Sequence, residues 1–135
     1  MLAKDLKFIE EFQPDMFGIG PFVPHGATPF AEFEQGSVEL TCYLLSIIRL
    51  ICPKVLLPST TALGTVDPFG REKGILSGAN VVMPNLSPEN VKAKYELYNG
   101  KISSGAEAAE NVNELSERME KIGFRIVAAR GDVKK

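Results

Sequence analysis

The sequence predicts an α/β fold built on a parallel β-sheet. Short apolar segments alternate with segments of helical periodicity in the order α-β-α-β-α-β-α-α-β. The short segments are almost wholly apolar, as expected for parallel strands that helices cover on both faces. A complete (β/α)8 TIM barrel takes about 250 residues, whereas this chain has 135. We therefore expect half a barrel with two open sheet edges, which indicates a fragment, a self-associating half or a small open-sheet fold.

The composition is that of an ordinary soluble globular protein, with 44% hydrophobic and 24% charged residues. The net charge is −2 and the pI is near 5.5, so nucleic acid and anionic membranes are poor candidates for partners. No signal peptide opens the chain, and charged residues and a proline interrupt the apolar run over residues 40–57. The expected compartment is the cytoplasm.

The first elements follow from periodicity and from the residues that end each one. A helix is predicted over residues 2–12, ending before Pro14, and a strand over residues 15–20. A proline-rich loop over residues 21–36 comes next, and loops of this length are often functional. Ser37 is then a plausible N-cap for an apolar helix that ends at Pro53.

The later elements repeat this alternation. A strand over residues 55–59 runs into a small polar segment, and Asp67 caps a helix that starts at Pro68 and ends near Gly78. The pattern then predicts a strand over residues 80–84, helices over 87–98 and 107–121, and a final strand or extended tail over 124–129.

In α/β folds the working residues lie at the carboxyl ends of the strands. Strand alternation places Met16, Gly18 and Gly20 on one face of the first strand. These glycines either leave room for a ligand or only permit close packing. Thr60 and Thr61 at the second strand end either bind a carboxylate or phosphate or cap the strand.

Other reactive residues give weaker signals. Cys42 and Cys52 fit no common metal or redox spacing and are expected to be buried, reduced thiols. The single histidine, His25, lies in a loop, and no nucleophile–base set can be proposed. Arg71 and Glu72 are expected to face solvent. On residue patterns alone, the prediction is half of a parallel barrel with a small-molecule cavity.

Three segments resemble one enzyme family in a single register. They are MFGIGPFVPHGATPF (residues 16–30), PSTTALGTVDPFGREKGILSGANVVMPNLSP (58–88) and YELYNGKI (95–102). These segments resemble the HydE family of radical S-adenosylmethionine (SAM) enzymes, which mature [FeFe]-hydrogenase. Biotin synthase and methylornithine synthase are relatives with the same architecture.

The resemblance implies the C-terminal half of a (β/α)8 barrel. Residues 1–102 would supply the last three barrel strands, and residues 103–135 a C-terminal cap helix and strand. The residues expected to line the cavity of the complete barrel and contact a small-molecule substrate are Met16, Thr60, Thr61, Met83, Tyr95 and Tyr98. Phe22 and Val23 would lie near the adenosine of SAM.

The chain departs from the family pattern in one respect. The CxxxCxxC motif that holds the family's [4Fe–4S] cluster is absent, so we expect this chain alone to bind neither the cluster nor SAM and to be inactive by itself. A separate N-terminal half chain, or self-association of this chain, would then complete the barrel. The gene would be split, truncated or misread. The alternatives are a biotin synthase or methylornithine synthase relative, or a non-catalytic half-barrel that serves as an interaction module or is a relic.

Overall fold

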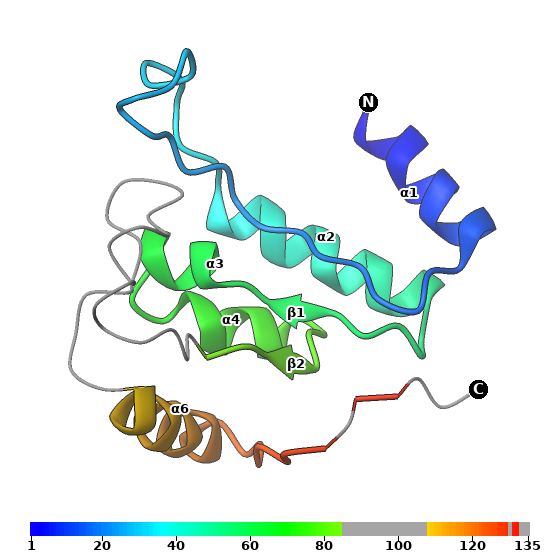
Figure 1. The fold of residues 1–135 in the computed structure, drawn as a ribbon. Coiled ribbons are helices and arrows are strands. Elements are labelled where there is room, and N and C mark those ends of the chain that lie inside the picture. Colours follow the sequence, from blue (N-terminus) through cyan, green and yellow to red (C-terminus); the bar gives the residue numbers. More distant parts are fainter. Residues whose placement is uncertain (85–107, 130, 133–135) are drawn as a thin grey trace.

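The computed structural model describes residues 1–84, 108–129 and 131–132, which form a mixed α/β arrangement (Figure 1). The elements in chain order are α1 (Leu2–Phe12), α2 (Val38–Ile51), β1 (Pro58–Ser59), α3 (Thr61–Val66), α4 (Gly70–Leu76), β2 (Val81–Val82) and α6 (Ala108–Lys121). The helix predicted over residues 87–98, which includes Tyr95 and Tyr98, lies outside the described residues.

The sheet is small and parallel. β1 pairs with β2, with Pro58 opposite Val81 and Ser59 opposite Val82. A single parallel bridge between Met16 and Leu56 adds the segment that follows α1. Three parallel segments are therefore neighbours in chain order, with β1 in the middle, which confirms the α/β class and its parallel pairing.

The strands are shorter than predicted. Residues 15–20 make only the Met16 bridge, because the glycines at 18 and 20 and the following Pro21 disfavour a longer ladder. In β1, Pro58 has no N–H to donate, and the regular strand covers two residues. The tail over residues 124–129 is not a strand, so the extended alternative holds there.

Helix α2 forms as the sequence predicts. The Ser37 hydroxyl accepts a hydrogen bond from the Leu40 N–H at 3.1 Å and so caps the first turn. Cys52 is the C-cap residue that follows the last helical residue, Ile51, and its N–H still donates to the Ile48 carbonyl. Pro53, which follows, cannot continue it.

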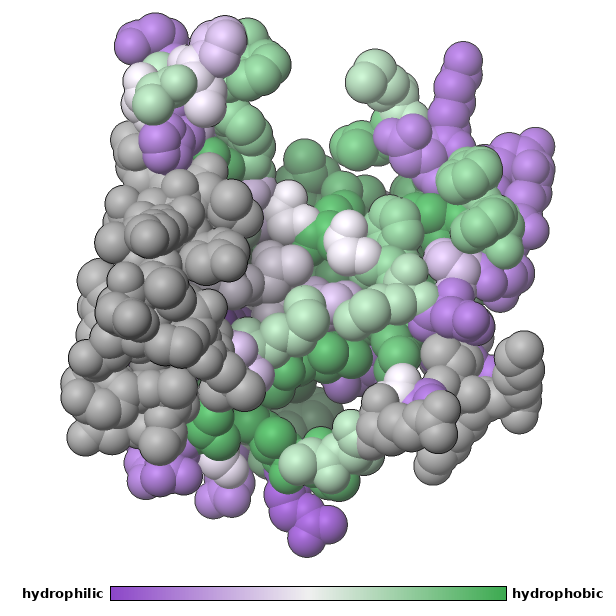
Figure 2. Space-filling view, in the orientation of Figure 1, coloured by the Kyte–Doolittle hydropathy of each residue, from purple (hydrophilic) through white to green (hydrophobic). Residues whose placement is uncertain are grey.

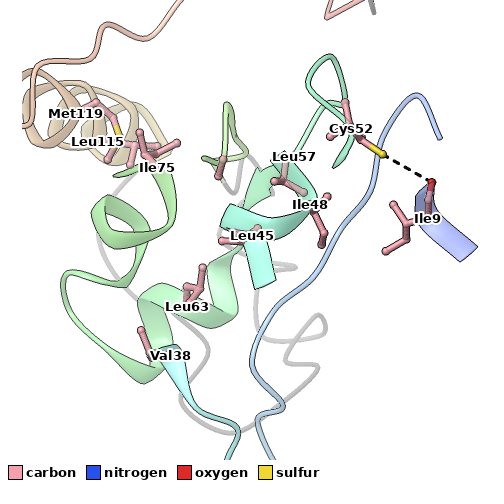
Figure 3. Close-up of a cluster of buried hydrophobic side chains, with 12 residues drawn as sticks. Ile9, Val38, Leu45, Ile48, Cys52, Leu57, Leu63, Ile75, Leu115 and Met119 are labelled. Carbon is pink, nitrogen blue, oxygen red and sulfur yellow. Dashed lines mark hydrogen bonds between the residues drawn. The ribbon is translucent and has the colours of Figure 1, made fainter. Parts of the chain in front are cut away.

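The hydrophobic core joins α2, the strand ends and α6 (Figure 3). Leu45 and Ile48 of α2, Leu57 before β1 and Leu63 of α3 are fully buried. Met119 of α6 is also buried, so the C-terminal helix packs on this same core. Helices and sheet thus form one packed unit, as the predicted layering requires.

The sequence pattern missed α3. Residues 59–61 were expected to end a strand, but Thr61 begins a helix that ends at Val66, and α4 begins at Gly70 rather than Pro68. Threonine and valine have low helix propensity, which hid the signal. Burial of Leu63 in the core outweighs that propensity.

Candidate functional site

The carboxyl ends of the three parallel segments lie at one edge of the sheet, because all three run in the same direction. Gly20 lies beside Thr60: a Cβ on Gly20 would be 2.7 Å from the Thr60 hydroxyl oxygen. Gly20 therefore permits close packing here. A Cβ on Gly18 would meet nothing within 4 Å, so open space lies beside that residue.

Thr60 carries an unsatisfied polar group at this edge. Its hydroxyl oxygen is buried and has no hydrogen-bond partner among the described residues. Although Thr60 is the N-cap residue of α3, its side chain does not cap the helix. A buried hydroxyl without a partner costs about 1–3 kcal/mol.

Thr61 is held by α4. The Arg71 guanidinium donates to the Thr61 hydroxyl oxygen at 3.4 Å, and both residues are half-buried. The carbonyl oxygen of Arg71 accepts a hydrogen bond from the buried Ser59 hydroxyl at 2.9 Å. The expectation that Arg71 faces solvent is therefore wrong: its backbone is fixed to β1, and its side chain brings a positive charge to the strand end.

The pattern Gly70-x-x-x-Gly74 is the sequence signal that would have revealed this packing. A Cβ on Gly74 would collide with the Ser59 hydroxyl, and one on Gly70 with the Leu63 carbonyl. Small residues four apart let one face of α4 approach the strand end closely. Arg71, which follows Gly70, is carried there with it.

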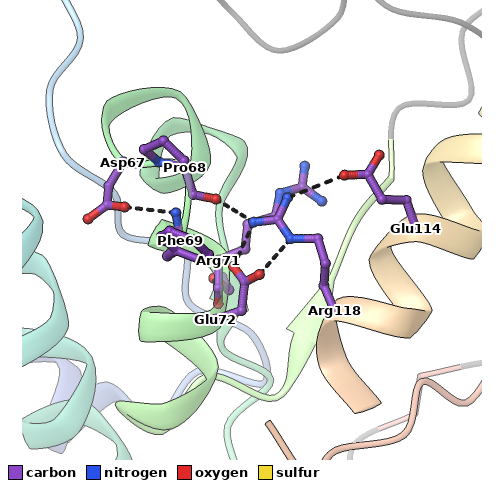
Figure 4. A network of polar contacts seen from close by, with 8 residues as sticks. Asp67, Pro68, Phe69, Arg71, Glu72, Glu114 and Arg118 are labelled. Carbon is purple, nitrogen blue, oxygen red and sulfur yellow. Dashed lines mark hydrogen bonds and ion pairs between the residues drawn. The ribbon is translucent and has the colours of Figure 1, made fainter. Parts of the chain in front are cut away.

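Glu72 is also buried, at 7% exposure, contrary to the sequence expectation. Its carboxylate accepts two hydrogen bonds from Arg118 of α6, from Nε at 2.5 Å and from Nη2 at 2.8 Å (Figure 4). Arg118 also donates to the Pro68 carbonyl. Burial is the largest single influence on Glu72 and opposes its ionisation. The bonds from Arg118, a backbone hydrogen bond and the charges of Arg118 and Arg71 together outweigh it, so the pKa of Glu72 is lowered. The bonds to Glu72 in turn raise the pKa of Arg118.

The turn between α3 and α4 is fixed by Asp67. Its carboxylate pairs with Lys73 and accepts the Phe69 N–H at 2.7 Å, and these contacts lower its pKa. Asp67 therefore fixes this turn, but the prediction that it caps a helix starting at Pro68 is wrong, because the N-cap of α4 is Phe69. Together with Arg118, this turn places α6 against α4.

The loop over residues 21–36 closes on itself. The Gly36 N–H donates to the Phe22 carbonyl at 2.8 Å, and a Cβ on Gly36 would be 2.5 Å from the Phe22 nitrogen. The Phe22 ring is 44% exposed and contacts Phe30 edge-on. Val23 beside it is half-buried, so these two residues offer apolar surface next to Gly20.

The six residues predicted to line the substrate cavity divide into three groups. Thr60 and Thr61 lie together at the β1 end with Gly20 and Arg71. Met16 and Met83 belong to the flanking parallel segments and are 45% and 52% exposed. Tyr95 and Tyr98 lie outside the described residues.

The residues of this chain do not fit a [4Fe–4S] cluster. The chain has two cysteines, both free, where a cluster of this type uses four thiolates or an equivalent set. Cys52 is buried, and its thiol lies near the Ile9 carbonyl (Figure 3) and near the Gln13 amide. Cys42 is only half-buried. In the described ranges, no three His, Cys, Asp or Glu side chains gather as metal ligands.

Among the described residues, no helix is long and apolar enough to span a lipid bilayer.

Comparison with known proteins finds similar enzymes, although no protein-family model matches the sequence. The chain is 46% identical over 101 residues to the [FeFe] hydrogenase maturase subunit HydE of Thermotoga maritima. The matched region covers 75% of this chain and 29% of that protein. It is 31% identical to the 3-methylornithine synthase of Methanosarcina acetivorans, over 64% of this chain and 24% of that enzyme. The match to the same enzyme of Methanosarcina barkeri is 32%, over 57% of this chain and 21% of the enzyme.

The chain thus spans less than a third of the length of each of these relatives. Two of the motif segments, within residues 16–30 and 58–84, lie in the parallel segments, the loop after the first of them, α3 and α4, whereas YELYNGKI lies outside the described residues. The chain is therefore a homologue of HydE over three quarters of its own length, related to the radical SAM enzymes as its motifs predicted.

Proposed function

We propose that this chain is the C-terminal part of a HydE-type radical SAM enzyme and supplies three strands of its barrel wall. The observation that carries the proposal is the 46% identity to HydE. The order of the three parallel segments supports it, because consecutive neighbours are what a (β/α)8 barrel requires. Residues 1–102 would form the barrel part and residues 103–135 the cap.

The substrate wall would centre on Thr60 and Thr61. A carboxylate placed there would take a hydrogen bond from the buried Thr60 hydroxyl, which has no other partner among the described residues. Arg71 donates to the Thr61 oxygen, which would leave the Thr61 proton free to point toward a ligand. Met16, Met83, Tyr95 and Tyr98 would complete this part of the cavity.

SAM would lie at the loop side of the same edge. The exposed Phe22 ring and the half-buried Val23 offer apolar contact for its adenosine. The cluster that activates SAM would be held by the part of the enzyme that this chain does not span, because the two cysteines here cannot hold it. We place the assembled enzyme in the cytoplasm.

A chimera tests this proposal. The chain would be joined to the N-terminal portion of Thermotoga maritima HydE, cut where its match to this chain begins, and expressed in cells that make an [FeFe]-hydrogenase but lack HydE. We expect the chimera to restore hydrogenase activity and the paired change T60V/T61V to reduce it at least about tenfold, since one buried hydrogen bond to a charged group is worth about 1.5–3 kcal/mol.

The matched control is T65V, which makes the same change one turn further along α3. The Thr65 hydroxyl donates to the Thr61 carbonyl within the helix, so we expect hydrogenase activity close to that of the unmodified chimera. Equal loss of activity in T65V and T60V/T61V would contradict the assigned role of the two threonines. A chimera that folds yet restores nothing would contradict the proposed function.

A second candidate is a 3-methylornithine synthase type of reaction, which the 31% and 32% identities favour. The product named there is an amino acid, and its carboxylate suits the same two threonines. Formation of 3-methylornithine by a chimera built on that enzyme, without any rescue of hydrogenase, would favour this candidate. Failure of both chimeras would favour a non-catalytic module.

A further inference from the structure

We infer that the outward face of α2 is a self-association surface, which pairs with the same face of a second copy of this chain in an antiparallel arrangement. The surface consists of Leu40, Tyr43, Ile47 and Leu50, which we call the α2 stripe. The inference goes beyond the proposed function, and only its extension to the assembled barrel rests on that function.

Helix α2 is apolar on two opposite sides. Its buried side chains, among them Leu45 and Ile48, belong to the hydrophobic core. The helical period of 3.6 residues puts the α2 stripe on the side away from that core. There Leu40, Tyr43 and Leu50 are 47%, 64% and 79% exposed. A surface helix carries polar residues on this side, so an apolar stripe here indicates a contact with another surface.

The spacing within the α2 stripe is that of a contact between two helices. Its members follow one another at intervals of three, four and three residues, which is the a and d pattern of a helix–helix seam. In an antiparallel pair centred on the stripe, Leu40 faces Leu50 of the second copy and Tyr43 faces its Ile47. Each copy supplies both members of these pairs, so the stripe is complementary to itself.

The charges at the two ends of α2 favour the antiparallel copy as the occupant. Glu39 lies in the first turn and Lys54 follows the end of the helix, and both are exposed. An antiparallel copy brings the Glu39 end of one helix to the Lys54 end of the other, whereas a parallel copy places like charges together. The net charge of the chain is only −2, so two copies repel each other weakly.

Completion of a barrel would leave the α2 stripe uncovered. The helices of a (β/α)8 barrel form an outer ring, with one side on the strands and the other side outward. Figure 2 shows the opposite side of this molecule, where the segment after α1 passes in front of α2 (Figure 1) and hydrophobic surface extends across the middle. The remainder of a barrel would cover surface on that side, whereas a second copy covers the stripe.

The contact is a small one. Helix α2 has 14 residues and is therefore about 21 Å long. One pair of such helices buries less surface than the roughly 1,600 Å² of a standard interface. We therefore expect a reversible dimer, with a dissociation constant on the order of 100 µM.

Sedimentation equilibrium of the unmodified chain and of the chimera described above tests the inference. We expect both to dimerise and L50E to raise the dissociation constant at least about tenfold, because it places a carboxylate against Leu40 and near Glu39 of the second copy. The matched control is L76E, which makes the same change at a 62% exposed leucine at the end of α4. We expect L76E to dimerise like the unmodified chain.

Disulfide trapping tests the antiparallel register. L40C and L50C would each be made in a C42S background, so that the half-buried Cys42 does not react, while Cys52 is buried. With a mild oxidant, we expect an equimolar mixture to give linked dimers, because these two positions face each other. Either variant alone stays unlinked, because equivalent positions then lie about 15 Å apart along the helix axis.

Circular dichroism first shows whether each variant folds, and L50S with L76S replaces the glutamate pair if L50E does not. The inference is overturned if the chain stays monomeric, if the two matched variants dimerise equally, or if each cysteine variant links alone as well as the mixture does. Dimers of the isolated chain that disappear in the chimera would show association through the open barrel surface and would also overturn it.

The two proposals fail in different ways. A dimeric chimera that restores no hydrogenase activity would uphold the α2 stripe and reject the proposed function. A monomeric chimera that restores the activity would uphold the proposed function and reject the α2 stripe.

Discussion

At the scale of single residues, the contact that anchors the C-terminal helix is the ion pair between Glu72 and Arg118. Replacing Arg118 by methionine keeps much of the side-chain volume but leaves the buried Glu72 carboxylate without its two donors. Because Arg118 is itself 28% exposed, water takes up part of the loss. We expect R118M to lower the free energy of unfolding by about 1–3 kcal/mol in urea titrations.

The control for R118M is R125M, which removes the same charge from an exposed residue beyond α6. We expect R125M to change the free energy of unfolding by no more than about 0.5 kcal/mol. Equal effects of the two substitutions would show that net charge, and not the ion pair, sets the stability.

The same pair predicts an acid sensitivity. The pKa of Glu72 is lower in the folded protein than its ordinary value of 4.5. Its contribution to stability is therefore present above that value and lost as the pH falls through the folded pKa. We expect the unfolding free energy of the unmodified chain to drop below about pH 4.5 more steeply than that of E72Q. Parallel curves for the two proteins would contradict this assignment.

Residue-level expectations failed where packing decided the outcome. The residue types of Arg71 and Glu72 indicated solvent exposure, yet α4 carries both into contact with β1 and α6. The partners are 12 and 46 residues away in sequence, so local periodicity could not identify them. The two threonines were chosen because they follow an apolar strand directly, and their role at a site stays a prediction.

At the scale of elements, α4 depends on two glycines. A Cβ on Gly70 would collide with the Leu63 backbone carbonyl, which cannot move as a flexible side chain could. We expect G70A to cost at least about 1–3 kcal/mol of unfolding free energy, measured by urea denaturation. G18A is the matched control, since its methyl group meets open space. A G70A protein as stable as G18A would contradict the close contact between α3 and α4.

Elements with local signals were predictable and those set by tertiary contacts were not. The Ser37 cap and Pro53 mark the ends of α2 in the sequence, and the structure confirms that helix. Helix α3 lacks such signals, because Thr61 and Val66 favour extended structure and only the burial of Leu63 stabilises the helix. The strands shortened because Pro58 and the glycines after Met16 limit the ladder.

At the scale of the whole molecule, the chain has three parallel segments but only two cysteines. We expect anaerobic reconstitution of this chain with iron and sulfide to give no stoichiometric [4Fe–4S] spectrum, because its two cysteines cannot supply the ligands. Absorbance and iron analysis measure this directly. A stable spectrum with four irons per chain would contradict the division of the enzyme that we propose.

The central claim is that this chain completes a HydE-type barrel. The most direct test is reductive cleavage of SAM by the chimera, followed as release of methionine and 5′-deoxyadenosine and compared with the N-terminal portion of HydE alone. We predict that the chimera cleaves SAM well above the level of the N-terminal portion alone. Equal cleavage with and without this chain would contradict the claim.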